Sequence, residues 1–188
     1  MPDTVVLDAR CLINLAAAGA LETWLSDLAL KWVLPEAVLG EALFLRASSG
    51  QPAAVADADP SEPVPEPITL APHIASGLLT VIRPETDAEL AAYVAFAREL
   101  DDGEAMALAI AECRGWRLAT DDRKPMRLAG AAGVSVLTTS MIVKQWADQR
   151  SPTATEIRVA LIAVRDRARF LPGGRDPLWD WWIERLNA

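Results

Sequence analysis

Residues 100–127, LDDGEAMALAIAECRGWRLATDDRKPMR, carry the pattern from which the organisation of the whole chain can be inferred. The pattern predicts a helix, a short turn and then a strand over residues 116–120. The acidic residues of this stretch stand at element boundaries: Asp101, Asp102 and Glu104 where the helix begins, Asp121 and Asp122 where the strand ends. In an open α/β sheet, ligands bind beyond the carboxyl ends of the strands. Carboxylates gathered there repel one another unless a cation joins them.

Short apolar runs alternate with helical patterns along the rest of the chain. Strands are expected over residues 4–7, 31–34, 78–82 and 134–137, in addition to 116–120. Helices are expected between and after them, over residues 35–47, 87–100, 124–133, 139–149 and 153–169 among others. Uniformly apolar strands separated by helices are typical of a parallel sheet that is covered on both faces. We therefore predict an α/β fold with a central, mainly parallel sheet.

The length of 188 residues suits one domain with its own core, and a hydrophobic fraction of 52% excludes a disordered chain. Residues 1–150 are expected to form that domain, with a proline-rich loop inserted at about residues 51–67. Residues 151–188 are expected to form a helical extension that packs on the domain or on a partner. If its last segment is a helix, Trp179, Trp182 and Ile183 share one face.

The composition excludes several classes of protein and site. No apolar run approaches the ~18 residues of a membrane span, and the first residues lack a signal-peptide pattern. We therefore expect a cytoplasmic protein that makes no membrane contact. His73 is the only histidine, and Cys11 and Cys113 have no metal-ligand spacing. Metal sites that need several histidines are excluded, and a Ser-His-Asp triad is disfavoured.

The charge is unevenly distributed along the chain. The net charge is −8, which argues against a general nucleic-acid coating protein. Residues 1–112 carry 18 acidic and 5 basic side chains, whereas residues 113–188 carry 8 acidic and 13 basic ones. An acidic half suits metal binding and a basic half suits phosphate binding. Solvated arginine faces on the later helices are an equally good explanation.

Two further acidic residues belong with the acids of residues 100–127. Asp8 follows the strand at 4–7, and Glu41 is expected about two turns into the helix at 35–47. These places share one edge of a parallel sheet, so the acids could converge. Clustered carboxylates without histidine or cysteine favour Mg²⁺ or Mn²⁺. Two such ions can activate a water and stabilise the leaving oxygen in phosphodiester cleavage.

Each acidic residue also has a purely structural alternative. Asp8 could cap the helix that follows it, and the pair at 121–122 could cap the next helix. Asp101 and Glu104 fit a capping box in which Asp replaces the usual Ser or Thr. Glu41 could be an ordinary surface glutamate. Spacing alone leaves the metal site and these alternatives open.

Four pieces of the chain occur in an order that resembles the PIN-domain nucleases, especially VapC-like toxins and their relatives. The pieces are VVLDARCLINL, PEAVLGEALFL, LDDGEAMALAIAECRGWRLATDDRKPMRLA and GVSVLTT, which together span residues 4–140. The resemblance implies a PIN-like three-layer α/β/α sandwich and metal-dependent ribonuclease activity. It implies that the catalytic acids are Asp8, Glu41, Glu104 and Asp122. Glutamate at the third of these positions departs from the commoner aspartate.

We therefore predict an endoribonuclease that hydrolyses RNA phosphodiester bonds with Mg²⁺ or Mn²⁺, as the toxin of a toxin–antitoxin pair. RNA is the expected substrate and an antitoxin protein the expected partner; a homodimer stays open. The predicted metal ligands are Asp8, Glu41, Asp102, Glu104, Asp121 and Asp122. Arg123 and Lys124 are the predicted RNA-binding residues, with plain solvated charge as an equal alternative.

Two other functions were weighed against the nuclease. The first is a catalytically silent PIN-like module that binds RNA or a protein partner. The second is a phosphatase of the aspartyl-phosphate kind, which requires a second aspartate two residues after the nucleophile. Residue 10 is arginine, so the phosphatase is the weakest candidate.

Overall fold

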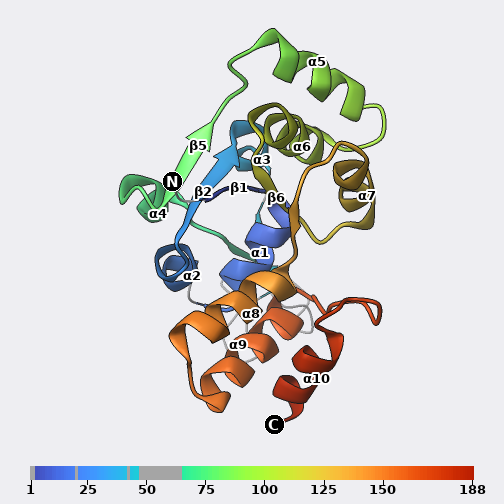
Figure 1. The fold of residues 1–188 in the computed structure, drawn as a ribbon. Coiled ribbons are helices and arrows are strands. Elements are labelled where there is room, and N and C mark those ends of the chain that lie inside the picture. Colours follow the sequence, from blue (N-terminus) through green and yellow to red (C-terminus); the bar gives the residue numbers. More distant parts are fainter. Residues whose placement is uncertain (1–2, 20, 42, 47–64) are drawn as a thin grey trace, which may run out of the picture.

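The computed structural model describes residues 3–19, 21–41, 43–46 and 65–188 (Figure 1). Within these residues, five strands form one parallel sheet in the order β5-β2-β1-β6-β7. Their bounds are β1 Asp3–Leu7, β2 Leu30–Pro35, β5 Leu79–Ile82, β6 Arg117–Ala119 and β7 Val136–Leu137. A separate antiparallel pair joins β3 (Phe44–Arg46) to β4 (Pro65–Pro67). The predicted α/β fold with a parallel central sheet is confirmed.

Helices cover both faces of the sheet (Figure 1). On one side lie α5 (Asp87–Phe96), α6 (Asp102–Arg114) and α7 (Arg123–Ala131). On the other side lie α1 (Ala9–Ala17), α2 (Leu21–Asp27), α8 (Thr139–Arg150) and α9 (Ala154–Arg167), with α10 (Trp179–Asn187) packed on α9. Two short helices, α3 (Glu36–Leu39) and α4 (Ala71–Ala75), lie next to β2 and β5. None of the described helices has the length and hydropathy needed to cross a bilayer.

The sheet separates two apolar cores, and β1 contributes to both. Successive side chains of a strand point to opposite faces. Val5 and Leu7 therefore pack on the side of α1, whereas Val6 packs on the side of α6. On the α1 side, the rings of Trp24 and Trp146 lie 4.4 Å apart between centroids, which joins α2 to α8. On the other side, the buried face of α6 is rich in alanine, so the helix can lie close to the strands.

The strand order creates a crevice at the carboxyl ends of β1 and β6. From β1 the chain continues to β2 and β5 on one side, and it reaches β6 and β7 on the other side only later. Such a change of direction in a parallel sheet opens a ligand-binding crevice. The backbone N–H of Asp8 donates to the carbonyl of Ala119 at 3.1 Å, so the two strand ends are adjacent. The acids that follow β1 and β6 are thereby brought to one place.

Two local predictions were wrong in part. The helix expected over residues 35–47 is one turn long, because α3 ends at Leu39, with Gly40 as its C-cap, and the chain then enters β3, which pairs with β4. Glu41 therefore lies in the turn after α3, where its N–H donates to the carbonyl of Val38 at 3.1 Å. Of the proline-rich loop expected over residues 51–67, residues 65–67 form β4, and the rest lies outside the described residues.

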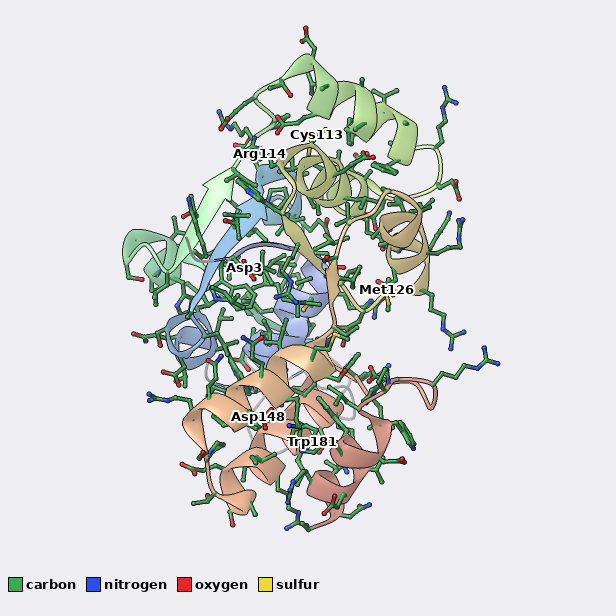
Figure 2. All side chains as sticks on the ribbon, in the orientation of Figure 1. Asp3, Cys113, Arg114, Met126, Asp148 and Trp181 are labelled. Carbon is green, nitrogen blue, oxygen red and sulfur yellow. The ribbon has the colours of Figure 1, made fainter. Side chains whose placement is uncertain are left out.

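The last two helices lie against the side of the sheet that α1 covers. α9 packs on α1 and α10 packs on α9. Trp182 is fully buried, and its ring meets that of Phe170 edge-on at 5.8 Å. Trp181 lies nearer the surface, beside α8, where the ammonium group of Lys144 is 5.8 Å from its ring (Figure 2). The apolar side of α10 is thus covered by this chain itself.

Candidate active site

Asp8 occupies the end of β1 and is almost completely buried. Its Oδ1 accepts the N–H of Cys11 at 2.7 Å, which caps α1. Its Oδ2 is also buried but has no hydrogen-bond partner among the described residues. Burial raises the pKa of Asp8 to about 7, and the carboxylates of Asp121 and Asp122 raise it too, against the lowering effect of Thr120 and the Cys11 N–H. An unpartnered buried oxygen is costly, so Oδ2 is a place where a ligand would be stabilising.

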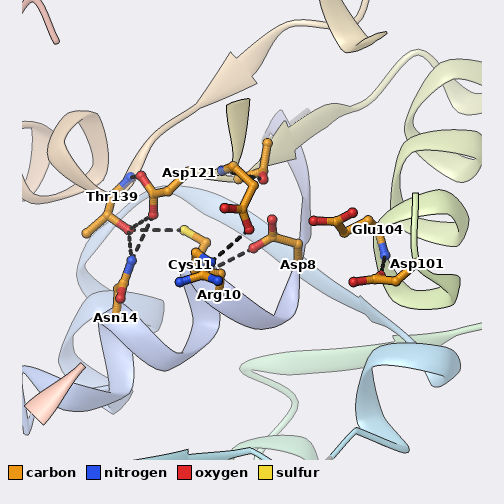
Figure 3. A network of polar contacts seen from close by, with 10 residues as sticks. Asp8, Arg10, Cys11, Asn14, Asp101, Glu104, Asp121 and Thr139 are labelled. Atoms are coloured by element: carbon orange, nitrogen blue, oxygen red, sulfur yellow. Dashed lines mark hydrogen bonds and ion pairs between the residues drawn. The ribbon is translucent and has the colours of Figure 1, made fainter. Parts of the chain in front are cut away.

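Four further acidic side chains face the same open cleft, which has a volume of about 360 Å³. They are Glu41, Asp101, Glu104 and Asp122. Glu104 points toward Asp8 from the first turn of α6 (Figure 3). Asp101 caps that helix, because its carboxylate accepts the N–H of Glu104 at 2.9 Å. Partial burial and the charge of Asp101 raise the pKa of Glu104, as expected for acids that repel one another.

Glu41 reaches the cleft because residue 103 is glycine. A Cβ atom at Gly103 would overlap Oε1 of Glu41 and would lie 3.2 Å from a methyl group of Val38. The Glu41 carboxylate therefore lies against the first turn of α6, where the helix dipole favours negative charge. Partial burial, followed by the charges of Asp101 and Glu104, raises the pKa of Glu41. Glu41 thus reaches the cleft from the turn after α3 and not from the predicted longer helix, and its dependence on Gly103 is visible only in three dimensions.

Asp122 is paired with Arg10, a cation that was not among the predicted site residues. The carboxylate of Asp122 accepts a hydrogen bond from Nε of Arg10 at 2.8 Å. Asp122 occupies the N-cap position of α7, but its side chain makes no capping bond there. Both members of the pair are well exposed, so their interaction is weak and can be exchanged for a stronger one. In the sequence, the one sign that Arg10 belongs to the site is its position two residues after Asp8.

Asp121 is turned away from the cleft. Its carboxylate accepts the backbone N–H of Thr139 at 2.9 Å, the hydroxyl of Thr139, and the side-chain amide of Asn14 at 2.9 Å (Figure 3). These bonds join the end of β6 to the first turns of α8 and to α1. Burial raises the pKa of Asp121, although the bonds from Thr139 and Asn14 oppose this effect. With its oxygens already used, Asp121 is placed to fix the strand end.

Three other predicted site residues also lie outside the cleft lining. Asp102 accepts the hydroxyl of Tyr93 at 2.9 Å, which links α6 to α5. Lys124 donates to the backbone carbonyl of Glu99. Arg123 faces a different cavity. The basic side chains that line the carboxylate cleft are instead Arg10, Arg167 and Arg169.

The donor set of the cleft suits a hard divalent cation. Carboxylate oxygens are the ligands that Mg²⁺ and Mn²⁺ prefer, and no histidine or cysteine stands among the described residues that line the cleft. Oδ2 of Asp8 supplies a buried oxygen that no donor in the described part of the chain satisfies. As the side chains stand, no three acidic, histidine or cysteine residues of the described ranges form a set that could hold an ion. Binding of an ion would therefore require rotation of some of these side chains.

Comparison with known protein families identifies the family of the chain. The family model described as PIN domain matches residues 4–173, from β1 to the segment between α9 and α10. No curated protein and no solved structure matches the chain. The matched range covers every acid that lines the cleft.

Proposed function

The chain belongs to the PIN-domain family, and from this membership we propose that it is a Mg²⁺- or Mn²⁺-dependent endoribonuclease. PIN domains are typically metal-dependent nucleases and generally use divalent metals. The observation that carries the proposal is the convergence of Asp8, Glu41, Glu104 and Asp122 on one cleft beyond β1 and β6. RNA as the substrate, and an antitoxin as the partner, are supported by the resemblance of the motifs to VapC-like toxins.

The four acids would bind the cation together, each from a different segment of the chain. Asp8 would hold the cation through Oδ2, and Glu41, Glu104 and Asp122 would complete the set from three other segments. A divalent cation bound there lowers the pKa of water and stabilises negative charge on the phosphate. In the metal-free protein, partial burial and the charges of neighbouring acids raise the pKa values of Glu41 and Glu104, and a bound cation would relieve that repulsion.

The proposal is tested by cleavage of a labelled single-stranded RNA by the purified protein. We expect cleavage in Mg²⁺ or Mn²⁺ and none in EDTA. Glu104→Gln should lower kcat/KM by more than about 100-fold, because loss of a ligand costs more than the 10–100-fold of an outer contact. Glu112→Gln is the matched control, since Glu112 is exposed on the same helix. Cleavage in EDTA, or equal activity of the two variants, would contradict the proposal.

A catalytically silent PIN-like module remains the second candidate, and one observation favours it. Arg10 already neutralises Asp122, one of the four acids, at 2.8 Å. In a silent module this pair would persist, and Mn²⁺ would leave the melting temperature unchanged. In the nuclease, Mn²⁺ raises the melting temperature, because only the folded chain gathers the acids.

A further inference from the structure

The end of α9 places an arginine in the cleft with an unusual backbone conformation. Arg169 has a φ of +53°, which lies in the left-handed region that favours glycine. Arg169 occupies the position directly after the C-cap residue Ala168, and glycine is the usual residue at that position. The N–H groups of Ala168 and Phe170 both donate to the carbonyl of Val164, at 3.2 and 3.3 Å. Arg169 thus places a long cationic side chain in a helix-ending turn whose backbone conformation favours glycine.

The residues on either side hold Arg169 at the cleft. Arg167 donates to the carbonyl of Ala17 at 3.1 Å and to the carboxylate of Glu66 at 2.6 Å. On the other side, the ring of Phe170 packs against the buried Trp182. The backbone at residue 169 is therefore fixed between α1 and α10, while its side chain is exposed.

Arg169 differs from the other two arginines of the cleft. Arg10 is paired with Asp122, and Arg167 is paired with Glu66. Arg169 has no ion pair within the part of the chain that the structure describes. A phosphodiester that enters an acidic cleft needs cationic contacts on the phosphates beside the scissile one. A guanidinium group suits this task, because its planar N–H groups match two phosphate oxygens.

We propose that Arg169 binds a backbone phosphate of the substrate beside the four acids and so positions the strand for cleavage. The inference rests on the proposed nuclease function. A purely structural role has to be distinguished from it, because a cation near the C-terminus of a helix is favourable without any ligand. The effect of backbone strain can be separated from the effect of charge by comparing substitutions at Arg169 and Ser151, because both residues have a left-handed backbone conformation.

The test compares Arg169→Gly and Arg169→Lys with the control Ser151→Gly. Ser151 has a φ of +48° at the C-cap of α8, so its glycine variant relieves similar strain without changing charge. Both glycine variants should be at least as thermostable as the wild type. Arg169→Gly should raise the KM for RNA by about tenfold and Arg169→Lys by less, whereas Ser151→Gly should leave the KM unchanged. Mn²⁺ affinity should stay equal or become tighter, since a cation leaves the cleft.

Binding is measured separately from cleavage, with every variant also placed in an Asp8→Asn background. The probe is a fluorescein-labelled single-stranded RNA, followed by anisotropy at several salt concentrations. Loss of one phosphate contact should reduce the slope of log affinity against log salt by about 0.7, a change that a structural role would not produce.

The possible results separate the two proposals. An unchanged KM and salt slope in Arg169→Gly would overturn the role of Arg169, whatever happens to stability. RNA binding without cleavage by the wild type would overturn the nuclease, while the salt slope would still decide the role of Arg169. A wild type that neither binds nor cuts RNA would overturn both.

Discussion

Asp8 and Glu89 are carboxylates that are equally inaccessible to solvent but have opposite electrostatics. Each side chain is only 2% exposed. Glu89, on α5, accepts Nε of Arg114 at 2.5 Å and the N–H groups of Glu85 and Thr86 at 2.5 and 3.1 Å. The bond from Arg114 lowers the pKa of Glu89 to about 2 despite its burial. Burial raises the pKa of Asp8 to about 7, and its Oδ2 has no donor among the described residues.

The difference separates a structural carboxylate from one that is open to a ligand. Arg114 lies at the C-terminal end of α6 (Figure 2) and also contacts the ring of Trp116, 4.9 Å from its centroid. At that end of α6, the buried carboxylate of Glu89 is satisfied by hydrogen-bond donors from the chain itself. The opposite end of α6 adds Glu104 to a cleft that already holds Asp8. A buried acid with a raised pKa and an unpartnered oxygen is a functional-site candidate, whereas a fully paired one is part of the scaffold.

The largest expected effect is on cleavage. Asp8→Asn should lower kcat/KM by more than about 100-fold, because the variant loses the negative charge beside a buried oxygen that has no donor among the described residues. Glu89→Gln should leave the activity of the folded protein within about twofold, because Glu89 lies outside the cleft lining. Both values come from initial rates in saturating Mn²⁺, corrected for the folded fraction. A similar loss in both variants would erase the distinction between the two acids.

Stability should respond in the reverse order. Glu89→Gln should lower the free energy of unfolding by about 3 kcal/mol, because it removes the nearer and more buried of the two carboxylates that pair with the mostly buried guanidinium of Arg114. Glu85→Gln is the control: Glu85 is exposed and lies 3.6 Å from Arg114, so its loss should cost less than about 1 kcal/mol. Asp8→Asn should instead stabilise the metal-free protein at pH 8, by on the order of 1–3 kcal/mol. Urea unfolding in EDTA measures the free energy of unfolding of the three variants. Destabilisation of the protein by Asp8→Asn would contradict the prediction.

The two acids should also control different limbs of the pH dependence. The raised pKa of Asp8 means that the folded state binds the extra proton, so stability falls as pH rises from about 4 to about 7. The lowered pKa of Glu89 means that its contribution is complete above about pH 4.3 and is lost as pH falls toward 2. Unfolding in EDTA from pH 2.5 to 8 should show Asp8→Asn flattening the upper limb and Glu89→Gln the lower one. An unchanged upper limb in Asp8→Asn would show that another group controls it.

The smallest expected effect concerns Gly103. Gly103→Ala should weaken Mn²⁺ binding several-fold, because the new Cβ pushes the Glu41 carboxylate away from the first turn of α6. The metal-free stability should change little, since alanine is the better helix former by about 1 kcal/mol and offsets the crowding. Gly130→Ala is the matched control, because a Cβ at that helical glycine meets nothing within 4 Å. Thermal shifts over a Mn²⁺ titration compare the variants, and equal affinities would mean that Glu41 does not bind the ion.

Much of the fold could be predicted because it depends on local patterns. Apolar runs without an alternating period indicated strands buried on both faces, and β1, β2 and β5 lie within a residue or two of the expected places. Helix starts were visible in the same way, since Asp8 and Asp101 cap α1 and α6 through their own side chains. The parallel order then brings the end of β1 to the end of β6, which is why Asp8 and Asp122 could be assigned to one edge.

The direction and partners of the site residues depended on contacts that are distant in sequence. Asp102 is next to Asp101 in the chain, yet it bonds to Tyr93 of α5 and not to the cleft. Asp121 is held by donors from α1 and α8, and Asp122 by Arg10. Arg169 enters the cleft only because α9 packs on α1. Periodicity and capping specify where an element begins and ends, but which acid stays open to a ligand is decided by the tertiary packing that supplies or withholds its donors.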